Sequence, residues 1–162
     1  MLVMPVSVGE VLTGKMIGIF LSGLVQQLLL IGSSTLFFGL RWGDTWGVLA
    51  LVVCATFAAV GWGVLIAAFT HTPGQAATAG SMLMLLFGLL GGSFVDLSAM
   101  PVQVYWLSRL TPNAWGLDGF AILAAGGTLA QIMQPLLALL VMGSALLGFT
   151  IVLTGRLRDM RR

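Results

Sequence analysis

The stretch that decides the fold is residues 76–119, AATAGSMLMLLFGLLGGSFVDLSAMPVQVYWLSRLTPNAWGLDG, an apolar run followed by short proline-led segments. The apolar run closes on Gly91–Gly92, and the chain turns polar at Asp96. Met100–Pro101 and Thr111–Pro112 then open two segments shorter than the roughly 20 residues that a helix needs to cross a bilayer. The pattern predicts a membrane-spanning helix that reaches one bilayer face and leads into a re-entrant helical hairpin.

Composition places the whole chain in the membrane. Of its 162 residues, 59% are apolar and 7% are charged, whereas a soluble domain carries about 25% charged residues. Seven Lys and Arg residues are too few for a nucleic-acid surface. The single Cys54 excludes a disulfide within the chain. We therefore expect an all-α integral membrane protein.

Long uncharged runs mark where the chain crosses the bilayer. Residues 45–95 carry no formal charge, and this run is too long for one span and right for two spans with a turn. His71–Gly74 supplies that turn, because Thr72 and Gln75 have capping-box spacing and Pro73 suits the first helical position. The sequence predicts four spans, with short helices at residues 97–132 between the last two: residues 16–40, 46–70, 75–95 and 133–154.

Charge bias predicts how the chain is oriented. Four spans place both termini on one side, and five of the seven basic residues lie there: Lys15, Arg156, Arg158, Arg161 and Arg162. The positive-inside rule makes this side cytoplasmic. We expect a multi-pass protein of the cell (inner or plasma) membrane with five parts: a cytoplasmic segment at residues 1–15, three spans within 16–96, outer helices at 97–132, a last span at 133–155 and a basic cytoplasmic tail at 156–162.

The first span carries a seam of small and polar residues. Gly18, Ser22, Gln26 and Ser33 are spaced so that they share one helix face. One interpretation is helix packing, which uses small and weakly polar residues in membranes. The other is a substrate path lined by Ser22, Gln26 and Ser33, with Gln27 beside them. Because a polar amide in lipid is costly, at least Gln26 should point into the protein.

Charged residues flank the expected hairpin. Asp96, Arg109 and Asp118 either ring the mouth of a water-filled cavity or are ordinary solvated loop residues. Non-helical backbone at membrane depth must be covered by protein or line such a cavity. Both interpretations place these three residues on the outer side.

No residue pattern supports chemistry in this chain. Gly9, Gly14 and Lys15 match the spacing of a phosphate-binding loop, but Met16 lacks the hydroxyl that holds magnesium and no strand precedes the loop. His71 has no second metal ligand near it in the sequence. We expect no catalytic, cofactor or metal site and no enzyme activity.

Three motifs in order resemble the permeases of type-2 ABC exporters. The first lies at the start, where Met4–Pro5–Val6–Ser7, Glu10 and Gly14–Lys15 are similar to the family's cytoplasmic coupling element. The second is Gly91–Gly92–Ser93–Phe94 followed by Met100–Pro101. The third resembles the family's outer helices and comprises Leu110–Thr111–Pro112, Ala114–Trp115 and Gly119.

The resemblance implies a permease subunit that works with other proteins. ATP would be bound and hydrolysed by a separate ABC ATPase subunit, and two permeases, identical or different, would meet in membrane lipid and expel substrate outward. A small, largely apolar path suits multidrug or lipid efflux, whereas Gln26 and Ser33 also suit polar cargo. It implies that Pro5, Ser7, Glu10, Gly14 and Lys15 couple to the ATPase. The outer gate would be formed by Gly91, Gly92, Phe94, Pro101, Pro112 and Trp115.

The chain departs from the family pattern because two earlier spans are missing. We therefore expect the C-terminal two-thirds or so of a permease: a fragment, a mis-called start or a half-sized subunit. A non-transporting membrane scaffold or accessory protein, or an inactive permease fragment, is therefore the alternative hypothesis. An intramembrane enzyme is disfavoured because the spans hold no paired carboxylates, Ser–His pair or metal-ligand set.

Overall fold

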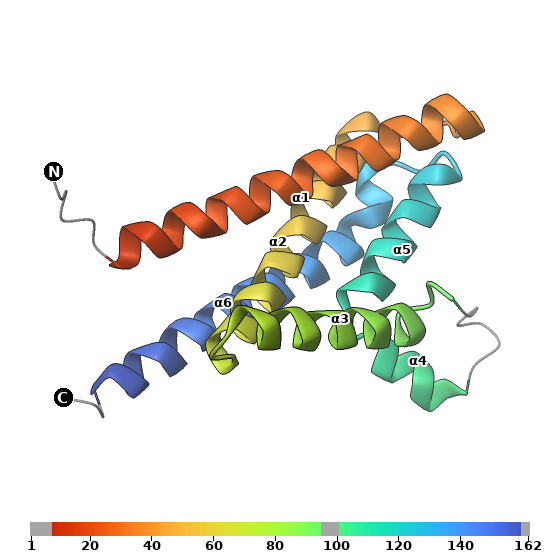
Figure 1. Ribbon diagram of the computed structural model, residues 1–162. Coiled ribbons are helices and arrows are strands. Elements are labelled where there is room, and N and C mark those ends of the chain that lie inside the picture. The colour runs from red at the N-terminus through yellow and green to blue at the C-terminus, as the bar shows by residue number, and fades with distance from the viewer. Residues whose placement is uncertain (1–7, 95–100, 160–162) are drawn as a thin grey trace, which may run out of the picture.

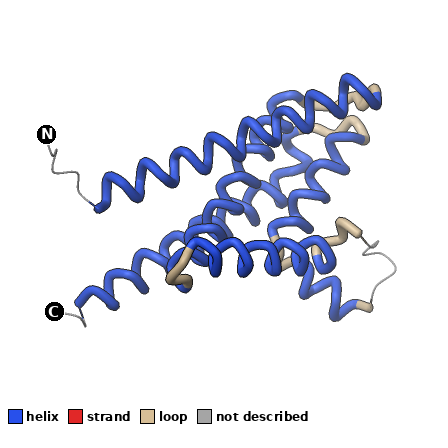
Figure 2. The backbone as a smooth tube through the Cα atoms, in the orientation of Figure 1, coloured by secondary structure: helices blue, strands red, loops and turns tan. Residues whose placement is uncertain are grey.

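The computed structural model describes residues 8–94 and 101–159, with the side chains of residues 13–94 and 101–153. Over these ranges the chain forms helices joined by turns (Figure 2). Figure 1 labels the α-helices, and the short 3-10 turn η2 precedes the last of them. The elements are α1 (Val8–Phe38), α2 (Thr45–Phe69), α3 (Pro73–Leu90), α4 (Val102–Ser108), α5 (Pro112–Ala124), η2 (Leu129–Ile132) and α6 (Met133–Asp159).

Four of these helices are long and apolar enough to cross a bilayer, which confirms the predicted all-α membrane fold. Their qualifying segments are Thr13–Phe38, Thr45–Phe69, Pro73–Leu90 and Leu129–Leu153. The start of the last segment differs from the predicted residue 133, because η2 adds an apolar turn that continues directly into α6. Each of the four predicted spans overlaps one of these helices.

The pair α2 and α6 forms the centre of the bundle. Its buried core includes Leu51 and Ala58 of α2 and Leu139 of α6, each with no exposed surface. Gly61 lies so close to Gly143 that a Cβ atom at residue 61 would stand 3.1 Å from the Gly143 carbonyl oxygen. Close backbone approach through small residues is how helices gain contact area in lipid. This seam is the main packing interface among the described helices.

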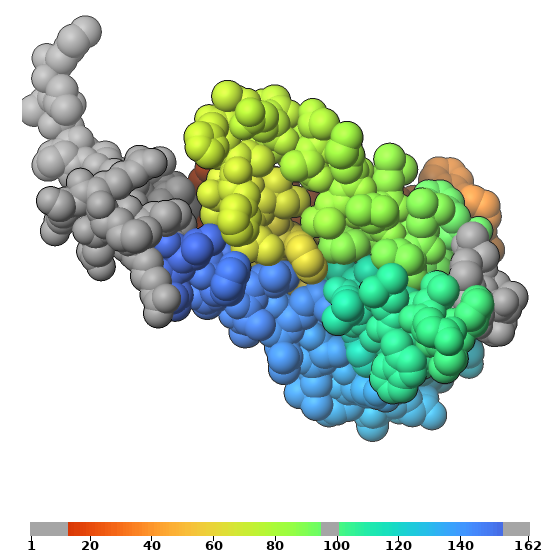
Figure 3. Space-filling model, turned by 90° about the horizontal axis from the view of Figure 1, so that it is seen from below, coloured from red at the N-terminus to blue at the C-terminus, as the bar shows by residue number. Residues whose placement is uncertain are grey.

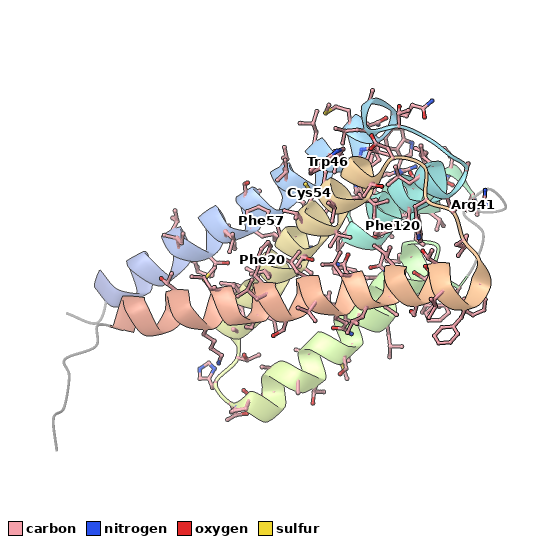
Figure 4. All side chains as sticks on the ribbon, turned by 90° about the horizontal axis from the view of Figure 1, so that it is seen from above. Phe20, Arg41, Trp46, Cys54, Phe57 and Phe120 are labelled. Carbon is pink, nitrogen blue, oxygen red and sulfur yellow. The ribbon has the colours of Figure 1, made fainter. Side chains whose placement is uncertain are left out.

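The helices α1 and α3 both lie against α2, and neither packs extensively on the other. In Figure 1 the start of α1, the turn between α2 and α3, and the end of α6 lie at the same end of the bundle. The loop between α1 and α2 lies at the opposite end, and Figure 4 shows Arg41 in it. The bundle thus places the first and last helical segments on one side, as four spans require.

The helices α4 and α5 form the short helical segment predicted between the last two spans. Residues of α5 pack against both α2 and α6, and a Cβ atom at Gly119 would meet the side chain of Leu51 at 2.7 Å. Viewed from below, α4 and the start of α5 lie at the end where α3 stops (Figure 3). How deeply this segment enters a bilayer stays a prediction.

Two helix starts follow the caps expected from the sequence. The hydroxyl of Thr72 accepts a hydrogen bond from the Gln75 amide, with Pro73 in the first turn. The Gln75 side chain reaches one residue further back than a capping box would, and accepts from the His71 amide. Thr111 caps α5 in the same way as Thr72 caps α3. A side-chain cap satisfies an otherwise unpaired amide of the first turn.

Candidate functional site

A cavity of about 560 Å³ lies between α1, α2, α3 and α5. Its walls include Gln27 and Ile31 of α1, Trp62 of α2, Phe87 of α3 and Asn113 of α5. None of its lining residues carries a formal charge. Ligand pockets commonly measure about 300–1,000 Å³ and are mostly apolar with a few polar groups. The cavity has the size and chemistry of a site for a small apolar molecule.

Aromatic pairs hold the walls of this cavity in place. The rings of Trp62 and Phe87 meet edge to face with their centroids 4.9 Å apart, which joins α2 to α3. Trp42 and Phe120 make the same kind of contact at 5.8 Å and join the loop after α1 to α5. Edge-to-face pairs add stabilisation beyond the area that they bury. These two pairs connect four separate segments around one space.

Three buried polar atoms of the cavity walls have no hydrogen-bond partner within the described residues. They are the Gln27 Oε1 atom and the Nε1 atoms of Trp42 and Trp62. Buried polar groups are normally paired, and an unpaired one costs about 1–3 kcal/mol. Three residues that line the cavity therefore carry an acceptor or an N–H donor that nothing in the described part of the chain uses.

The prediction that Gln26 points into the protein is wrong. Gln26 is exposed, and its neighbour Gln27 is the amide that faces the cavity. Ser22, Gln26 and Ser33 do share one face of α1, where they line a shallow depression formed by residues of α1 alone. The hydroxyls of Ser22 and Ser33 are bonded to carbonyl oxygens of their own helix, which is the usual way to satisfy them in lipid. Their role as a substrate path stays a prediction.

Charged and aromatic side chains join α4 to α5. Arg109 forms an ion pair with Asp118 and donates a second hydrogen bond to the Tyr105 hydroxyl at 2.7 Å. Its guanidinium carbon lies 4.6 Å from the ring centroids of both Tyr105 and Trp115. Trp115 in turn donates to the Arg109 carbonyl oxygen at 2.8 Å. Arg109 and Asp118 are thus paired with each other, and Asp96, the third residue of the predicted ring, lies outside the described residues.

These contacts also govern the protonation of Arg109. Burial lowers the pKa of Arg109, but the hydrogen bonds to Asp118 and Tyr105 and their charges outweigh burial and raise it above its ordinary value. The guanidinium stays charged, because hydrogen bonding to the charged form favours that form. The corner between α4 and α5 is therefore a permanently charged and well-bonded structure.

The glycine pair at the end of α3 permits a tight turn against α5. A Cβ atom at Gly91 would stand 2.5 Å from the Cβ atom of Asn113, so only glycine fits there. Gly92 has φ 86°, a conformation that glycine adopts without strain. The ring of Phe94 covers Gly88, where a Cβ atom would meet it at 2.5 Å. Asn113 donates to the Ser93 hydroxyl at 3.1 Å and completes the junction.

The structure gathers most of the predicted outer-gate residues around this junction and the α4–α5 corner. Gly91, Gly92 and Phe94 lie at the end of α3, while Pro112 and Trp115 lie in the first turn of α5. Pro101 precedes α4 as its N-cap residue. Their role as a gate stays a prediction.

A cap that sequence reasoning missed ties the loop before α2 to the start of η2. The carboxylate of Asp44 accepts from the Trp46 amide at the start of α2 and from the Leu129 amide at the start of η2, both at 3.0 Å. The Gly43 amide donates to the Leu123 carbonyl oxygen, and the Asp44 amide to that of Gly127. An acidic residue just before an apolar helix was the available signal for the first of these bonds.

The predicted coupling residues lie at or before the start of α1. Gly14 and Lys15 are exposed in its early turns. Glu10 lies within α1, but its side chain is outside the described set, as are Pro5 and Ser7 altogether. No group of three or more His, Cys, Asp or Glu side chains comes together among the described residues. The site is therefore built from apolar, aromatic and neutral polar groups.

Comparison with known proteins identifies this arrangement of spans and motifs. Residues 1–125 match the family model described as ABC-2 type transporter, and the chain belongs to this family of membrane subunits. The chain is 27% identical over 127 residues to the linearmycin resistance permease protein LnrN of Bacillus subtilis (strain 168). That alignment covers 78% of this chain and 33% of LnrN, so the chain spans about a third of that relative's length. No solved structure matches the chain.

Proposed function

We propose that the chain is the permease subunit of an ATP-driven exporter, which moves substrate outward across the cell membrane. The family match over residues 1–125 is the observation that carries this proposal. The four apolar spans supply the membrane path. ATP is hydrolysed by a separate ABC ATPase subunit, and a second permease completes the transporter.

The ATPase docks at the end of the bundle where α1 begins. Lys15 is exposed at this end, while Arg41 is exposed in the loop at the opposite end. The excess of basic residues near Lys15 and in the tail makes this end cytoplasmic by the positive-inside rule. Force generated by ATP-driven closure of the ATPase subunits would then enter the bundle through α1, which packs on α2.

The test is coupled activity in reconstituted vesicles. The permease chain in its natural full length is purified with its ATPase, and ATP hydrolysis and ATP-dependent substrate accumulation are measured in inside-out vesicles. We expect Lys15→Gln to lower transport-coupled hydrolysis several-fold and Arg41→Gln, an exposed cation at the other end, to leave it unchanged. Association with no ATPase, or an equal effect of the two substitutions, would refute the proposal.

The alternative function is a non-transporting membrane scaffold or accessory protein. It is motivated by the coverage of only a third of the permease relative. Under this hypothesis the chain binds an ATPase or another permease without supporting flux. ATP-dependent accumulation that is lost when the chain is omitted from the same vesicles would eliminate it.

A further inference from the structure

We infer that the cavity between α1, α2, α3 and α5 is a binding site for an uncharged amphiphile that carries a hydroxyl or carbonyl group. The site lies within one chain, and Gln27 and Trp62 are the residues that recognise the polar group. The inference deepens the proposed function, because it assigns the substrate class that such a subunit binds. It rests on the unpaired polar atoms, on the charge of the lining and on the cavity volume.

The lining selects against charge. None of the residues around the cavity carries a formal charge, and moving an ion into such a space without a partner is strongly unfavourable. The walls are mainly aliphatic and aromatic, with Ile31, Phe87 and Phe120 among them. A neutral molecule with a large apolar body matches this surface.

The unpaired atoms select for one or more polar groups on that body. The Nε1 atoms of Trp42 and Trp62 can only donate, so they require an acceptor such as a carbonyl or hydroxyl oxygen. The Oε1 atom of Gln27 accepts and suits an N–H or O–H donor. A site built to bond such a group rejects analogues that lack it, because its own polar atoms are then left unpaired. An alkyl amide carries both functions in one head group.

The chain supplies its own control on the same helix. Gln26 and Gln27 are adjacent in α1, but Gln26 lines the shallow depression formed by α1 alone, and Gln27 lines the cavity. Gln26→Leu and Gln27→Leu each remove one side-chain amide from α1, so the two variants have the same amino-acid composition. Only the substitution at Gln27 removes an unpaired acceptor from a residue that lines the cavity.

The experiment is photo-crosslinking of the purified full-length protein in lipid nanodiscs. The probe is a long-chain alkyl amide with a diazirine in the chain, and labelled residues are mapped by mass spectrometry. We expect saturable labelling of peptides that contain Gln27, Trp62, Phe87 and Asn113. Unlabelled amide should compete, and the alkylammonium and alkane of equal length should not. Gln27→Leu and Trp62→Phe should weaken labelling of these cavity peptides at least several-fold, whereas Gln26→Leu should leave their labelling unchanged.

Each other outcome overturns the inference. Labelling that rises linearly with probe and is spread over all spans means that the probe only dissolves in lipid. Competition by phosphatidylcholine identifies a bilayer lipid as the occupant, and an unlabelled cavity means that a protein segment covers it. Circular dichroism of each variant checks folding. Since the measurement needs neither ATPase nor flux, its failure is distinct from failure of the transport proposal.

Discussion

The guanidinium of Arg109 pairs with the carboxylate of Asp118 across the turn that joins α4 to α5. The two side chains are buried to different extents: 17% of the Arg109 side chain is exposed, compared with 40% of the Asp118 side chain. Arg109 also stacks on Tyr105 and Trp115, so it has partners that Asp118 does not share. The α4–α5 corner therefore depends more on Arg109 than on its acidic partner.

The first prediction follows from the greater burial and the additional contacts of Arg109. Asp118→Asn should cost at most about 1 kcal/mol of unfolding free energy, since partly exposed ion pairs contribute little. Arg109→Ala should cost about 2 kcal/mol, because two cation–π contacts are lost with the pair. Thermal unfolding of both variants in the same detergent measures the order. An equal loss of stability would contradict the assigned role of the aromatic rings.

The second prediction concerns the pH dependence of this corner. Burial lowers the pKa of Arg109, but its hydrogen bonds to Asp118 and Tyr105 raise it above the ordinary value. A raised pKa gives stability that is fully present below the unfolded-state pKa and is lost only as pH rises through the folded-state pKa. Between about pH 6 and pH 9, Arg109 stays protonated in both states. The loss of unfolding free energy caused by Arg109→Ala should therefore be the same at both pH values.

The third prediction tests the bond between the loop before α2 and the start of η2. Asp44→Ala removes the acceptor of the Trp46 and Leu129 amides and should cost about 2 kcal/mol, from a lost helix cap and an unpaired amide. Asp44→Asn keeps one side-chain oxygen and should cost about half as much. Hydrogen–deuterium exchange should rise at the Leu129 amide in Asp44→Ala. Unchanged exchange there would show that the carboxylate does not hold η2.

The fourth prediction concerns backbone contact at the same place. A Cβ atom at Gly43 would stand 2.5 Å from the carbonyl oxygen of Gly127 and 2.6 Å from the carbonyl carbon of Gly126. Since backbone cannot rotate away, Gly43→Ala should cost about 2 kcal/mol through overpacking. Gly63→Ala on α2 is the control, because open space surrounds that position. Similar melting temperatures for the two variants would contradict the loop contact.

The fifth prediction is the topology. Cys54 is buried in the core and is first replaced by Ala. His71→Cys and Arg41→Cys then each place one exposed thiol at opposite ends of the bundle. A membrane-impermeant maleimide should label Arg41→Cys in intact cells and His71→Cys only after permeabilisation. The reverse pattern would place the chain ends outside the cell.

Local signals in the sequence predicted the spans and the helix starts. Thr72 and Thr111 cap helices because the capping bond joins residues three apart, which a sequence displays directly. The turn after α5 is also local, since Gly126 has φ 86°, a conformation that favours glycine. Such features need no knowledge of which helices meet.

The face that each span buries could not be predicted in the same way. The first span is apolar on nearly every side, so Gln26 and Gln27 gave no basis for choosing which points inward. The bond from Leu129 to Asp44 joins residues 85 positions apart and depends on how α5 returns to the first loop. The cavity depends on four segments at once, and no periodicity records it.

The arrangement of α1 and α3 has a mechanical consequence. Both rest on α2 without extensive contact between them, while the core seam of the bundle lies between α2 and α6. Tilting α1 away from α3 would widen the space that Gln27 and Trp62 face, yet leave Gly61 packed against Gly143. The width of the pocket would then change while the packing between α2 and α6 stays the same.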